Sequence, residues 1–143
     1  MQVRFARHTS RLEQLVHFYR DGLGLAELGR FTAHDGYDGV FLDLPGTNAH
    51  LEFTSGGSHP PPDSHEETLL VLYLGDEKTV VETWRRTGAQ PVEPANPYWR
   101  RSGVTVLDPD GFPVVLVPSL YPVPAEDGPS SYDSDGHQSE PRP

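Results

Sequence analysis

In the first part of the chain, the spacing of hydrophobic residues changes in turn between strand-like and helix-like patterns. Residues 2–7 are strand-like, and a helix is expected over residues 11–20. The apolar face of this helix is formed by Leu12, Leu15, Val16 and Tyr19, which recur at helical spacing. Turns containing Gly, Asp and Pro then separate strand-like runs at residues 25–31, 39–44 and 49–54. The pattern therefore predicts a strand, a helix and three strands.

The same order recurs in the second half of the chain. An apolar strand is expected over residues 69–74, and Asp76 can cap a helix that Gly88 ends. The remaining strands are expected at residues 90–93, 104–107 and 114–117, with a Pro- and Asn-rich loop between the first two. The recurrence indicates an internal duplication. The predicted fold class is α+β, with two tandem βαβββ modules.

Composition divides the chain into four parts. Residues 56–68 are rich in Gly, Pro, Ser and acidic residues and are interpreted as a linker. Residues 121–143 combine prolines with acidic residues and offer little to bury, so a disordered acidic tail is expected there. The two modules are accordingly placed at residues 1–55 and 69–120.

Charge and cysteine content restrict the partners. The formal net charge is −10, which disfavours nucleic acid and anionic membranes as partners and favours a small molecule. The sequence has no cysteine, so disulfides and thiolate metal sites are excluded and a reducing cytoplasm is expected. No apolar run reaches the length of a membrane span, and the first residues carry charges where a signal peptide is apolar.

Two motifs, one in each half, carry a resemblance to a known superfamily. They are Phe-Tyr-Arg-Asp-Gly-Leu-Gly-Leu at residues 18–25 and Asp-Pro-Asp-Gly at residues 108–111. With the duplicated modules, they resemble the vicinal-oxygen-chelate superfamily of glyoxalases, bleomycin-resistance proteins and dioxygenases. His-Leu-Glu-Phe at residues 50–53 and Asn-Pro-Tyr-Trp at residues 96–99 further resemble a bacterial subfamily. The resemblance implies curved mixed sheets around a cup-shaped cavity, and it also suggests a homodimer.

The resemblance places the superfamily's metal ligands at four positions of this chain. These positions hold Arg4, Glu52, Leu69 and Val115. Only Glu52 can bind a metal, because Arg is a permanent cation and Leu and Val have no donor atom. No metal cofactor is therefore expected at these positions. The alternative is a displaced site for one divalent metal ion at His8, His50 and Glu52, which share strand faces by parity.

A metal-free cup would still be an apolar concavity with a few polar groups, as in many small-molecule sites. The residues expected to bind a ligand are Arg4, His50, Glu52, Tyr73, Tyr98, Trp99, Arg100 and Val115. The favoured function is binding of an aromatic or cationic metabolite or antibiotic. The alternative is an enzyme, a glyoxalase-like lyase or isomerase or a dioxygenase, that uses the displaced metal or Glu52 as a general base.

Overall fold

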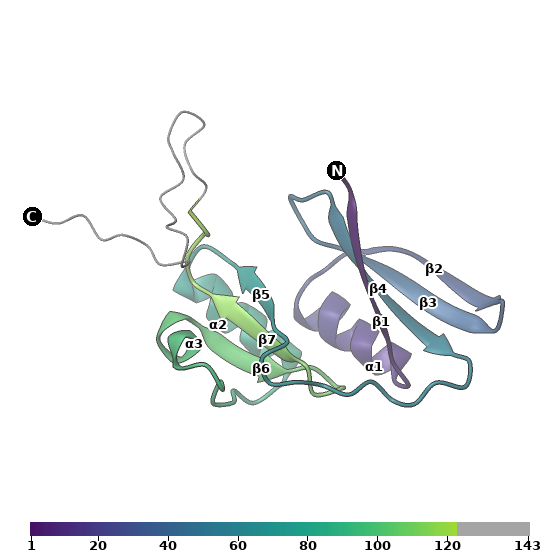
Figure 1. Ribbon diagram of the computed structural model, residues 1–143. Helices are drawn as coiled ribbons and strands as arrows, with labels where there is room; N and C mark the ends of the chain where they lie inside the picture. Colours follow the sequence, from purple (N-terminus) through teal and green to yellow (C-terminus); the bar gives the residue numbers. More distant parts are fainter. Residues whose placement is uncertain (123–143) are drawn as a thin grey trace, which may run out of the picture.

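The structure is a computed structural model that describes residues 1–122, and Figure 1 shows its two βαβββ-like modules side by side. The first module contains a strand, a short helix that continues as a π-helix, and three strands. Their bounds are β1 Val3–His8, α1 Leu12–Val16, η1 His17–Gly22, β2 Glu27–His34, β3 Tyr37–Asp43 and β4 Ala49–Gly56. The expected disordered tail falls almost entirely on residues 123–143, which lie outside the described part. No helix of the described part is long and apolar enough to cross a membrane.

The first module forms one mixed sheet with the strand order β1-β4-β3-β2. The edge strand β1 is parallel to β4, with Arg4 opposite His50 and Ala6 opposite Glu52, and the other pairs are antiparallel. Side chains alternate between the faces of the sheet. Leu51 and Phe53 of β4 are buried beneath α1 and η1, so His50 and Glu52 point to the opposite, open face.

The second module repeats this topology with a smaller sheet of order β5-β7-β6. Here β5 is parallel to β7, and β6 is antiparallel to it. The element bounds are β5 Leu70–Tyr73, α2 Glu77–Thr87, α3 Pro97–Ser102, β6 Val104–Leu107 and β7 Pro113–Val117. The α+β class with two mixed sheets is thus confirmed. As predicted, Asp76 caps α2 by accepting a hydrogen bond from the Thr79 amide at 2.8 Å.

Two sequence predictions in the second module were wrong. The strand expected at residues 90–93 is reduced to a single bridge between Pro91 and Val106, because proline has no N–H to extend a ladder. The loop expected after it contains the helix α3. Asn96 caps this helix by accepting a hydrogen bond from the Tyr98 amide at 2.9 Å, and Pro97 occupies the first turn, where its missing N–H costs nothing.

The two modules share one hydrophobic core. The buried cluster joins Leu15 and Tyr19 of the first module to Val80 and Val114 of the second. The helices η1 and α2 pack closely at Gly22, where a Cβ atom would lie 3.0 Å from the Cα of Thr87. Arg86 of α2 also donates a hydrogen bond from Nε to the Gly22 carbonyl at 3.1 Å. A larger residue at position 22 would therefore push the modules apart.

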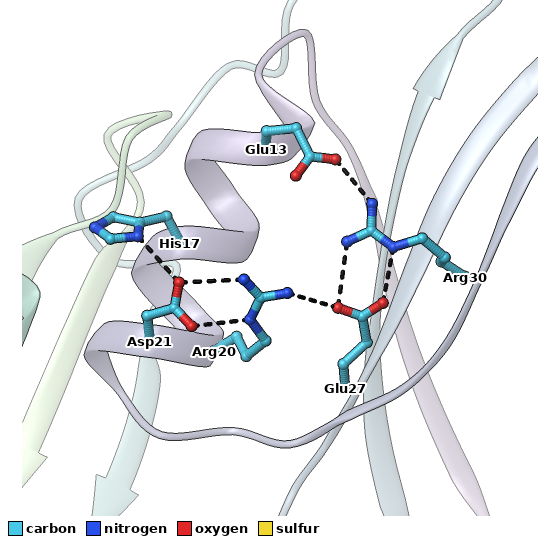
Figure 2. A network of polar contacts seen from close by, with 6 residues as sticks. All are labelled: Glu13, His17, Arg20, Asp21, Glu27 and Arg30. Carbon is cyan, nitrogen blue, oxygen red and sulfur yellow. Dashed lines mark hydrogen bonds and ion pairs between the residues drawn. The ribbon is translucent and has the colours of Figure 1, made fainter.

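A series of ion pairs connects the helical segment α1–η1 to β2 (Figure 2). Arg30 joins Glu13 to Glu27, and Arg20 joins Glu27 to Asp21, with nitrogen–oxygen distances of 2.7–2.9 Å. The Arg30 and Arg20 guanidinium groups hold the pKa of Glu27 below its usual range. The lowered pKa means that this stabilisation is present at neutral pH and is lost as pH falls through the carboxylate range. The network is exposed, so its contribution is also sensitive to salt.

A second, buried set of charges joins β1 to the hairpin before β7. Arg7 Nη2 donates a hydrogen bond to Asp108 Oδ2 at 2.5 Å, and Tyr19 Oη donates to the same oxygen at 2.8 Å. The other Asp108 oxygen, Oδ1, accepts hydrogen bonds from the amides of Asp110 and Phe112. The guanidinium group also lies 3.8 Å from the centre of the Phe112 ring. Burial and the nearby Asp108 charge raise the pKa of Tyr19 well above its ordinary value.

We expect Arg7→Met to destabilise the protein by about 3–5 kcal/mol, because it leaves the buried Asp108 carboxylate without its cation. Arg4→Met is the matched control. It makes the same change on the same strand, but the Arg4 side chain is 53% exposed, so the expected cost is below about 1 kcal/mol. Urea unfolding of both variants measures the difference. Equal losses of stability would show that the Arg7–Asp108 pair does not hold the modules together.

Candidate functional site

The open face of the first sheet carries a cluster of three predicted site residues. Arg4 donates from Nε to His50 Nε2 at 3.0 Å, and its Nη1 lies 3.4 Å from Glu52 Oε2. The structure thus brings Arg4, His50 and Glu52 together, because they occupy adjacent positions of the β1–β4 ladder. The Arg4 guanidinium also lies over the Phe41 ring, 4.9 Å from its centre.

This cluster does not fit a metal ion. His50 Nε2 already accepts a hydrogen bond from Arg4, a permanent cation that would repel a metal ion beside it. In the β1–β4 ladder, Arg4 pairs with His50 and His8 pairs with Thr54. His8 is four residues from Arg4 along β1, so it lies about 13 Å from the Arg4–His50 pair at the rise of a β-strand. His8 therefore does not join His50 and Glu52. Across residues 1–122, no three His, Cys, Asp or Glu side chains gather closely enough to hold a metal.

A cavity lies elsewhere, against the second sheet and beside α3. Its volume is about 580 Å³, within the usual range of small-molecule sites. Trp99 of α3 forms one wall, and Thr105 and Leu107 of β6 form the floor. The remaining wall residues are Ser64, His65, Glu66, Leu69, Val92, Glu93, Pro94, Ala95, Asn96, Gly111 and Pro113. Residues 64–66 thus line a cavity, although their composition indicated only a linker.

The short helix α3 determines where the Trp99 ring lies. The Asn96 cap and Pro97 fix its first turn, and the Gly103 amide donates to the Trp99 carbonyl at 3.1 Å to close its last turn. Gly103 is needed there, since a Cβ atom would lie 2.6 Å from the Leu116 carbonyl oxygen. Trp99 is half-buried and makes an edge-to-face contact with the Tyr98 ring. A large aromatic ring is thus held against the cavity by a fixed backbone.

The polar groups of this cavity are mainly acidic or uncharged. Glu66 and Glu93 contribute carboxylates, and Arg100, which is not a lining residue, forms an ion pair with Glu93. Thr105 in the floor is 4% exposed, and its hydroxyl has no hydrogen-bond partner in the described part of the chain. Such a hydroxyl costs free energy while it is unsatisfied. A polar group of a ligand could satisfy it after a small local shift.

The other predicted site residues lie outside this cavity. Val115 is completely buried in β7, and Tyr98 is exposed on α3. Tyr73 packs edge-to-face against Tyr121, and burial raises the pKa of Tyr73 above its ordinary value. None of the described cavities contains both Trp99 and the Arg4 cluster. The sequence did not identify Glu66, Glu93 and Thr105 as residues that line the cavity. The Asn96-Pro97 helix start was the one sequence signal that could have indicated where Trp99 lies.

Comparison with known proteins matches both modules to a single family. Residues 3–54 match the YycE-like N-terminal domain, and residues 67–118 match the YycE-like C-terminal domain. The chain belongs to the YycE-like family. The uncharacterized protein YycE of Bacillus subtilis (strain 168) is 42% identical over 123 residues, which cover 82% of this chain and 88% of that protein.

Solved structures confirm the glyoxalase/bleomycin-resistance fold expected for this YycE-like chain. A 2.0 Å crystal structure of YycE from Bacillus subtilis superimposes with a TM-score of 0.77 at 37% identity, covering 87% of this chain and 93% of that chain. The trypanothione-dependent glyoxalase I of Leishmania major gives 0.64 at 21% identity, over 83% and 86% of the two chains. The antibiotic-binding protein TnmS3 from Streptomyces sp. CB03234 gives 0.60 at 22% identity, over 83% and 96%. The last two similarities concern the fold alone.

We expect Arg4→His to create affinity for Zn²⁺ or Ni²⁺ that the unchanged protein lacks at this face. The substitution removes the cation and places a second imidazole beside His50 and Glu52, and two His with one carboxylate is a competent ligand set. Calorimetric titration with metal measures the gain, and Arg4→Gln is the control that removes the charge without adding a ligand. Equal metal binding by all three proteins would contradict this account of Arg4.

Proposed function

We propose that this YycE-like protein binds a small molecule in the cavity formed by Trp99 and the second sheet. The single observation that carries the proposal is a cavity of about 580 Å³ with a fixed aromatic wall and an unsatisfied hydroxyl in its floor. Concave sites with a few placed polar groups are the usual small-molecule sites of proteins. TnmS3, an antibiotic-binding protein with the same fold, supports the proposal.

The side chains around the cavity favour an aromatic or cationic ligand. The Trp99 ring can stack with an aromatic ligand or attract a cation to its face. Glu66 adds negative charge, whereas the Glu93 carboxylate is paired with Arg100, and the chain as a whole carries a formal charge of −10. A ligand with an ammonium group on an aromatic ring would therefore find both a flat apolar wall and complementary charge.

Catalysis by Glu52 receives less support from the geometry. Its carboxylate is paired with Arg4, and its side chain is only 12% exposed. A general base must reach the proton that it removes, so a carboxylate engaged by a neighbouring cation is poorly placed for that role. The Arg4–Glu52 pair is better explained as a polar group that fills the open face of the first sheet.

Benzyltrimethylammonium is expected to quench the fluorescence of Trp99 and to bind about tenfold more weakly to Trp99→Ala, since a cation–aromatic contact contributes roughly 1–2 kcal/mol. Fluorescence is read from the Trp84→Phe variant, in which Trp99 is the remaining tryptophan. Calorimetry measures affinity in the otherwise unchanged protein. Tyr98→Ala is the matched control, because Tyr98 lies on the same helix outside the cavity lining.

Benzenesulfonate and toluene test the ligand class, as an aromatic anion and a neutral ring. The expected order of affinity is the cation first and the anion last. A complete lack of saturable binding across the three compounds would contradict the proposal, as would equal affinities of Trp99→Ala and the unchanged protein.

A further inference from the structure

A second cavity lies where the two modules meet. It is smaller than the cavity beside Trp99, and its lining is more apolar. Its volume is about 190 Å³, and it lies between the helix-facing side of the first sheet and the start of the second module. The two cavities share Leu69 and Pro113 as a common wall. The lining residues of the second cavity are mostly apolar and include Phe5, Leu44, Leu51, Phe53, Leu70 and Phe112.

Besides Thr68, two polar residues line this cavity, Arg7 and Tyr19. Both already donate hydrogen bonds to Asp108, so their charges and donors are largely satisfied within the protein. The exception is Arg7 Nε, which is buried and has no hydrogen-bond partner among the described residues. An unsatisfied buried donor costs free energy. An acceptor oxygen on a ligand would remove that cost after a slight shift of the guanidinium group along the Phe112 ring.

The electrostatics of the junction favour a ligand without charge. The Arg7 cation faces Asp108 and also lies 3.6 Å from Asp110, so the protein itself supplies the counter-charge. An anion would meet these two carboxylates, and a cation would meet Arg7. Apolar walls would penalise either charge further.

The volume limits the ligand to about one aromatic ring. An apolar cavity of about 150 Å³ accommodates benzene, so one of about 190 Å³ has room for a ring with one small substituent. We infer that the module junction binds a neutral, single-ring aromatic molecule that carries one hydrogen-bond acceptor. The ring lies among Phe5, Leu51 and Phe53, and the acceptor faces Arg7.

The test uses the full chain and a matched pair of probes, 4-fluorophenol and 4-fluorotoluene, observed by fluorine NMR. Both probes have the size of the cavity, but only the phenol offers an oxygen to Arg7. We expect saturable binding of both, with the phenol several-fold tighter. Binding should be lost in Leu44→Phe, which fills the cavity, and retained in Trp99→Ala, which alters only the other one. Circular dichroism verifies that the variants fold, and Leu70→Phe replaces Leu44→Phe if the latter does not.

Two results would overturn the inference. The first is no saturable binding of either probe at millimolar concentration. The second is binding that disappears in Trp99→Ala and survives filling of the junction, which would assign the probes to the larger cavity. Different substitutions alter the two cavities, so the two proposals can fail separately. A negative result at the junction does not bear on ligand binding beside Trp99, and a negative result beside Trp99 does not bear on the junction site.

Discussion

The contact between Arg7 and Asp108 fixes how the two modules meet. Arg7 is on the edge strand of the first module, and Asp108 is completely buried in a turn of the second. Such a buried pair depends on saturating the remaining hydrogen-bonding capacity of the carboxylate. Asp108 achieves this with Tyr19 and with two amides of its own turn. Loss of one partner would leave a charge in the core, so the orientation of the modules is narrowly determined.

Both cavities depend on the Arg7–Asp108 contact between the modules. The turn that contains Asp108 leads through Phe112 into β7, and Pro113 at the start of that strand lines both cavities. The alternation of strand residues separates the roles of two arginines on β1. Arg7 faces the core and joins the modules, whereas Arg4 faces the open side and pairs with His50 and Glu52. One strand therefore supports the fold with one face and carries a polar cluster on the other.

Periodicity in the sequence predicts most of the fold. Alternating and helical patterns identify β1, β4 and α2, and the parity of β4 places His50 and Glu52 beside Arg4. The π-helix at His17–Gly22 could not be predicted, because the apolar spacing of one short turn does not distinguish it from an α-helix. The sequence around Pro91 and Asn96-Pro97 predicts a strand and a loop from its apolar pattern, although proline weakens a strand and Asn-Pro is a good helix start.

The position of the candidate site could not be predicted from the same patterns. Residues 64–66 have the composition of a linker, and composition does not say which surface a segment crosses. Glu66 and Glu93 are far apart in sequence and lack any spacing that would link them. Burial also separates residues on one sheet face, since Val115 lies on the same face as Tyr73 by strand register but is completely buried. Tertiary packing thus decides which residues of one strand face can contact a ligand.

A crystal structure of the full chain soaked with benzyltrimethylammonium would show which cavity binds this ligand. We expect electron density for the ligand against the Trp99 ring, between residues 64–66 and the strand β6. Density at Arg4, His50 and Glu52 on the open face of the first sheet, with the Trp99 cavity empty, would contradict this expectation.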